Sequence, residues 1–125
     1  MAVVYPNAVK IARMAAVVSQ AGTTAVLEIG TTGMASVLAT IALANPIAPA
    51  ATGVGLLTFS GFPRSDTAAD ATGTAAAARI RTATAGTDIV TGLTVGLSGS
   101  DVNLDSLSIT AGQTVTINSF TLQHA

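Results

Sequence analysis

From residue 23 onward, the chain consists of short β-type runs separated by turn residues, and this pattern limits the folds open to it. Val, Ile, Leu and Thr are concentrated in the runs, while Gly, Pro, Asn and Asp lie between them. Seven such runs, or eight if one is broken, indicate a mainly β fold built as a sandwich or a small barrel. We expect this β-body to cover residues 23–125. The expected strands are 24–30, 36–43, 55–60, 75–82, 88–97, 102–109 and 113–122.

Alternation within two of these runs predicts which side chains face the core. In run 88–97, the odd-numbered residues Ile89 to Leu97 share one side, which we expect to be the core side. In the last run, Val115 and Ile117 lie on one side, whereas Phe120 and Leu122 continue on the other, polar side. This change of phase predicts either a β-bulge or an apolar patch offered to a partner.

Residues 6–20 carry the clearest helical spacing and make residues 1–22 an N-terminal helical segment. Pro6 suits the first position of a helix, and Gly22 suits its end. Lys10 and Arg13 are three residues apart and therefore give the helix a cationic edge. The helix either caps one end of the β-core, which we favour, or docks as an arm on an acidic neighbour.

Composition restricts both the core and the partners of this single domain of 125 residues. Half the residues are apolar, but aromatic residues make up only 3%, so the core must be built from small side chains. Charged residues make up 9% of the chain, against about 25% in an ordinary domain. So few charges oppose association only weakly, which indicates an assembled state. The near-neutral net charge of −1 disfavours nucleic acid as a partner.

The chain lacks the features of a membrane protein and of a disulfide-linked one. No apolar run approaches the roughly 20 residues of a membrane-spanning helix, and cysteine is absent. We expect no membrane partner and synthesis in the cytoplasm.

Residues that could carry chemistry are few. Asp101, Asn103 and Asp105 match the opening of a calcium-binding loop, but Ser106 and Gly112 stand where Gly and Glu are needed. In a strand the same spacing gives a polar outer face with Val102 and Leu104 inward, which we favour.

Catalytic groups are equally sparse. His124 is the only histidine and lies next to the chain end, which favours a solvated or contact role over a catalytic one. A pair of Glu28 and an aspartate would suit a glycosidase, but one Tyr and no Trp leave little to stack on a sugar. We expect no enzyme activity, no metal and no cofactor.

Two charged groups in the β-region are candidates for contacts. Arg79 and Arg81 share a strand face and form either a stripe paired with aspartates on a neighbouring strand or an interfacial clamp for carboxylates. Both interpretations remain open. The segment 61–74, like 44–53, reads as a loop, and it carries Arg64, Asp66 and Asp70.

Two stretches are more specific than the rest of the chain, "ADATGTA" at 69–75 and "LSITAGQTVTINSFTL" at 107–122. Through them, and over nearly its whole length, the chain resembles a family of small structural proteins encoded in tailed-bacteriophage genomes and prophages. The chain departs from the family in having four alanines before Arg79, where an aromatic residue is expected. The resemblance implies capsid cement or decoration, with a β-sandwich or jelly-roll-like body on the capsid shell.

We therefore expect a decoration protein on the virion capsid surface that bridges neighbouring subunits of the major capsid protein. Self-association is also expected, as a homo-oligomer and perhaps a trimer at local threefold positions. The alternatives are a tail or head-to-tail connector component, and a carbohydrate-binding or adhesin module on the virion surface. The residues expected at the interface are Lys10, Arg13, Phe62, Arg64, Asp66, Arg79, Arg81, Phe120, Leu122 and His124.

Overall fold

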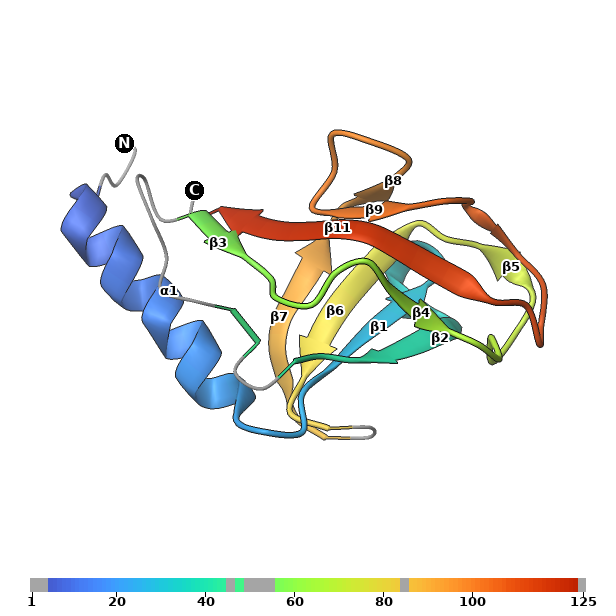
Figure 1. Cartoon of the computed structure of the whole chain (residues 1–125), viewed down its shortest axis with the longest axis horizontal. Coiled ribbons are helices and arrows are strands. Elements are labelled where there is room, and N and C mark those ends of the chain that lie inside the picture. Colours follow the sequence, from blue (N-terminus) through green and yellow to red (C-terminus); the bar gives the residue numbers. More distant parts are fainter. Residues whose placement is uncertain (1–4, 45–46, 49–55, 84–85, 124–125) are drawn as a thin grey trace.

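The computed structural model describes residues 5–44, 47–48, 56–83 and 86–123, and shows a β-sandwich with one N-terminal α-helix (Figure 1). The helix α1 covers Asn7–Ala21, and a short 3-10 helix η1 covers Thr32–Met34. The strands are β1 (Val26–Gly30), β2 (Val37–Ala42), β3 (Leu56–Thr58), β4 (Arg64–Asp66), β5 (Gly73–Thr74), β6 (Ala77–Arg81), β7 (Asp88–Leu93), β8 (Val95–Gly96), β9 (Val102–Leu104), β10 (Ser108–Ile109) and β11 (Val115–Gln123).

Two sheets face each other across the core. One has the order β2-β1-β6-β7 and is antiparallel throughout. The other has the order β3-β11-β9-β8, with β4 also paired to β11, and a separate two-stranded ladder joins β5 to β10. The alanine-rich run 75–82 forms β6, as predicted. β4 and β5 correct the prediction of an uninterrupted loop over 61–74, because these polar stretches find strand partners only in the tertiary fold.

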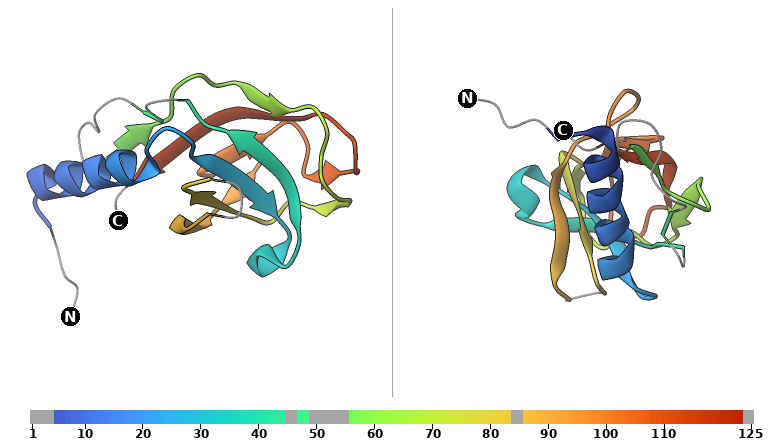
Figure 2. Two further views of the ribbon diagram at one scale, coloured as in Figure 1. Left: turned by 90° about the horizontal axis from the view of Figure 1, so that it is seen from below. Right: turned by 90° about the vertical axis from the view of Figure 1, so that its left-hand side faces the viewer.

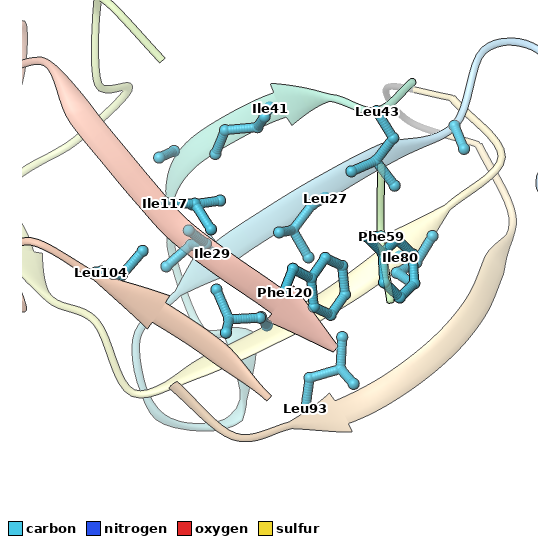
Figure 3. Packing of buried hydrophobic residues seen from close by; sticks show 14 of the residues in the cluster. Leu27, Ile29, Ile41, Leu43, Phe59, Ile80, Leu93, Leu104, Ile117 and Phe120 are labelled. Carbon is cyan, nitrogen blue, oxygen red and sulfur yellow. The ribbon is translucent and has the colours of Figure 1, made fainter. Parts of the chain in front are cut away.

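The core is built from aliphatic side chains of both sheets around a small aromatic cluster (Figure 3). Leu27 and Ile29 of β1 are fully buried, as is Ile117 of β11. Phe59 and Phe120 stack with ring centroids 3.8 Å apart, and Phe62 meets Phe120 edge-on at 6.0 Å. The three phenylalanines of the chain therefore lie together, where each large ring removes more surface from water than an alanine.

The predicted core face of run 88–97 is wrong at Thr91 and Leu97. Leu93 is buried, and Ile89 and Val95 pack against the core. Thr91 is exposed, however, and Leu97 is 60% exposed. Gly92 has a φ of 73°, which interrupts the strict alternation of a strand. The chain then leaves β7 and enters the second sheet as β8.

The change of phase in the last run is a β-bulge, one of the two predicted outcomes. The pairing of β11 with β9 shifts register between Ile117 and Ser119. The shift turns Phe120 into the core, where it is 1% exposed.

Helix α1 caps one end of the sandwich, as favoured from the sequence, and packs on its own domain (Figure 2). Met14 and Ala21 are buried, and Ile11 and Val18 pack against the core from the same side of the helix. The helix contacts β3 of one sheet and β7 of the other, so it closes the gap between them. Within the described residues, no helix is long and apolar enough to span a membrane.

Candidate interaction surfaces

Arg64 and Asp66 seal the outer edge of β2. The backbone N–H of Thr40 donates to Asp66 Oδ2 at 3.0 Å, and Arg64 Nη1 donates to the carbonyl of Ala42 at 2.9 Å. The N–H of Asp70 donates to the carbonyl of Leu38 at 2.7 Å. An edge strand exposes unpaired backbone groups that recruit other strands, so these bonds protect β2 from pairing with another chain.

Arg79 and Arg81 form an ion-pair network on the outer face of the first sheet. Arg79 Nε lies 2.7 Å from Glu28 Oε1, and Arg81 Nη1 lies 3.7 Å from the same oxygen. Arg81 Nε lies 3.1 Å from Asp88 Oδ1, and its Nη2 donates to the carbonyl of Gly86. Of the two interpretations of this pair, the structure shows the stripe paired with carboxylates on neighbouring strands.

Glu28 is the centre of this network, and sequence reasoning did not single it out for that role. It lies opposite Arg79 in the register of β1 and β6, and it is only 4% exposed. The available signal was a carboxylate alternating with Leu27 and Ile29 in one run. Alternation places Glu28 on the outer face, but it does not reveal that two arginines cover it.

The two helix cations differ in their exposure to solvent. Arg13 is exposed, and its guanidinium carbon lies 4.6 Å from the centroid of the Tyr5 ring. Lys10 is partly buried, and Val9 is 40% exposed. The helix contains no acidic residue.

The apolar interface candidates are placed differently from one another. Phe120 is wrong as a contact residue, because the bulge in β11 buries it against Phe59. Phe62 and Leu122 pack against the core but keep part of their surface exposed. His124 lies outside the described residues.

The possible calcium ligands instead hold a loop between β8 and β9. Asp101 Oδ2 accepts bonds from Thr94 N at 3.0 Å and from Thr94 Oγ1 at 3.1 Å. Asn103 Oδ1 accepts a bond from the N–H of Ser100. Val102 and Leu104 are buried, as the strand interpretation predicted.

Across the described ranges, no group of three or more His, Cys, Asp or Glu side chains could hold a metal ion, and no pocket is found. Leu97, which sequence reasoning assigned to the core, is the most exposed large hydrophobic residue of the described chain. Comparison with known protein families, curated proteins and solved structures finds no match to this chain.

Proposed function

We propose that the chain is a capsid cement or decoration protein of a tailed bacteriophage. It binds the outer surface of the head and bridges neighbouring major capsid protein subunits. The observation that carries the proposal is that most charges of the sandwich body are already bonded within the chain. Arg64 and Asp66 hold β2, Arg79 and Arg81 hold Glu28 and Asp88, and Asp101 holds Thr94.

The remaining outer surface is rich in short, neutral side chains. Burying an unpaired charge against a partner is expensive, whereas a hydroxyl keeps its hydrogen bonds if the partner supplies a donor or acceptor. Small side chains also let two backbones approach closely. Within the described part of the chain, the exposed threonines are Thr23, Thr24, Thr32, Thr58, Thr67, Thr72, Thr74, Thr87, Thr91, Thr94, Thr110 and Thr114.

A capsid shell repeats the same partner surface many times. When copies of the chain are linked as an oligomer, each further contact becomes intramolecular, and modest contacts add up to strong retention. A closed homo-oligomer, such as a trimer at local threefold positions, would match this geometry. The sequence resemblance to phage structural proteins supports the same function.

Particle survival tests this proposal. Heads of the encoding phage made without the chain are challenged by heat or low salt, with and without added purified protein. We expect the added protein to restore survival, while an unrelated small β-sandwich protein at equal concentration does not. Equal survival in all three samples would overturn the cement function, and rescue that requires tails would point to the connector alternative.

A further inference from the structure

We propose that the loop 97–101 is a pre-organised anchor whose Leu97 inserts into an apolar pocket on the outer face of a shell subunit. This inference rests on the proposed cement function and names the contact through which it acts. The loop projects beyond β8 and β9 at the top of Figure 1. Its only charged residue is Asp101, at its base.

The path of this loop is unusual. β8 and β9 are parallel neighbours, with Val95 opposite Val102, yet only residues 97–101 join them. Parallel strands ordinarily need a crossover of about a dozen residues or more. Here the chain turns back on itself, and the N–H of Val102 donates to the carbonyl of Thr94 at 3.0 Å. Compact loops with adjoining ends are frequently functional.

Side chains clamp the base of the loop. Thr94 donates through its N–H and its hydroxyl to Asp101 Oδ2, and the N–H of Asp101 donates back to Thr94 Oγ1 at 3.0 Å. Asn103 binds the N–H of Ser100 and also donates to Ser119 Oγ of β11. These bonds fix the loop to Thr94, just before β8, and to Asn103 of β9.

Close packing further restricts the loop on both sides of Leu97. A Cβ at Gly96 would lie 2.5 Å from Ser100 Oγ, so the two sides of the loop touch there. Gly99 has a φ of 70°, which completes the turn. These contacts restrain the loop backbone in a conformation that leaves Leu97 exposed.

The tip of the loop can enter an apolar pocket, because the residues around Leu97 are small and uncharged. Leu97 is 60% exposed, and its neighbours Gly96, Ser98, Gly99 and Ser100 carry neither charge nor bulk. A partner surface can therefore approach the leucine closely without desolvating an ionic group. A rigid loop also loses little conformational entropy on binding.

Binding of purified full-length protein to heads that lack it tests the anchor. Bound protein is measured by co-sedimentation over a concentration series. We expect Leu97→Ser to weaken binding about 10- to 100-fold, as expected for losing one buried leucine side chain per contact. Leu97→Met should stay within about threefold, because it keeps an apolar side chain of similar volume.

Two further variants separate the anchor from other effects. Val9→Ser removes an apolar side chain that is 40% exposed on α1 and should leave binding unchanged. Thr94→Val keeps Leu97 but removes the hydroxyl bonds of the clamp, and should weaken binding by less than Leu97→Ser does. Unchanged circular dichroism and thermal midpoints confirm that all four variants fold.

The outcomes distinguish the two proposals. If the wild-type protein binds heads and Leu97→Ser binds equally well, the anchor is overturned and the cement function stands. If the wild-type protein does not bind heads, both fail. If Leu97→Ser abolishes self-association in solution while each protomer still binds heads normally, the leucine contacts a second copy, which also overturns the anchor.

Discussion

At the scale of single residues, Glu28 is a charged side chain that the sandwich buries almost completely. Its carboxylate lies beneath Arg79 and Arg81, whose side chains are 21% and 22% exposed. The arginines therefore cover the carboxylate while keeping access to water themselves. The network holds β1, β6 and β7 together on the face opposite the core.

Glu28→Ala is expected to destabilise the fold by about 2–4 kcal/mol. Removing one partner of a buried pair typically loses about 3–5 kcal/mol, and the partial exposure of both arginines reduces that loss. Urea unfolding measures the change. Asp105→Ala, an exposed carboxylate, serves as the control and should stay within about 0.5 kcal/mol. Equal losses in the two variants would contradict the structural role of Glu28.

Phe120→Ala should destabilise the protein by about 3–5 kcal/mol, because it empties the centre of the phenylalanine cluster. Phe120→Leu keeps most of the volume and should lose less than Phe120→Ala does, so the pair separates cavity formation from loss of stacking on Phe59. Thermal unfolding followed by calorimetry provides the comparison. A loss below about 1 kcal/mol for Phe120→Ala would mean that the residue is not buried as described.

Glycine is required at positions 30 and 99 for different reasons, close packing at Gly30 and a positive φ at Gly99. A Cβ at Gly30 would lie 2.6 Å from the backbone oxygen of Ser36, whereas one at Gly99 meets nothing within 4 Å. Gly99 instead has a positive φ of 70°, for which alanine loses about 1–2 kcal/mol. We therefore expect Gly30→Ala to be the more destabilising variant in denaturant titrations. The reverse order would contradict the close approach between Gly30 and Ser36.

At the scale of elements, the outer edge of β2 is protected by side chains where a strand would otherwise pair. The segment 64–70 supplies bonds to Leu38, Thr40 and Ala42, and β4 is itself paired with β11. Arg64 and Asp66 thereby connect the two sheets along this side. The two side chains therefore help to close the sandwich, and this role does not depend on any contact with a partner.

The double variant Arg64→Ala/Asp66→Ala should expose this edge and promote self-association. Thr40 N–H and the Ala42 carbonyl lose their partners, and unpaired edge groups recruit strands from other copies. Sedimentation velocity over rising concentration should show larger species than the wild type does. Lys10→Ala/Asp105→Ala removes the same charges elsewhere and should not show them. Identical sedimentation of both double variants would refute edge protection.

The sequence predicted elements well where hydrophobic alternation was local. The inward positions of Val102 and Leu104 follow from alternation, and alternation together with the flanking residues predicted the strand at β6. For β11 the spacing predicted either a bulge or an apolar patch, and the structure has the bulge. It missed β4, whose Arg-Ser-Asp sequence has no apolar side, because only pairing with β11 makes it a strand. It also carried one strand through Gly92, where a positive φ and a change of sheet redirect the chain.

At the scale of the whole molecule, the sandwich is closed around its perimeter. Segment 64–70 closes the side at β2, the crossing at Thr94 joins β7 to β8 on another side, and α1 caps one end (Figures 1 and 2). Most charged groups of the described β-body bond to other parts of the fold, either at these closures or within the first sheet. Spacing along the chain could not predict contacts such as Arg64–Ala42 and Arg79–Glu28, because these partners lie 22 and 51 residues apart.

Electron cryomicroscopy of particles made with and without the chain tests the central claim most directly. The account predicts density on the outer shell of complete particles, across contacts between neighbouring major capsid subunits, that disappears when the chain is absent. The sandwich and its cap α1 should fit this density. Identical shells in the two samples, or density confined to the tail, would contradict the account.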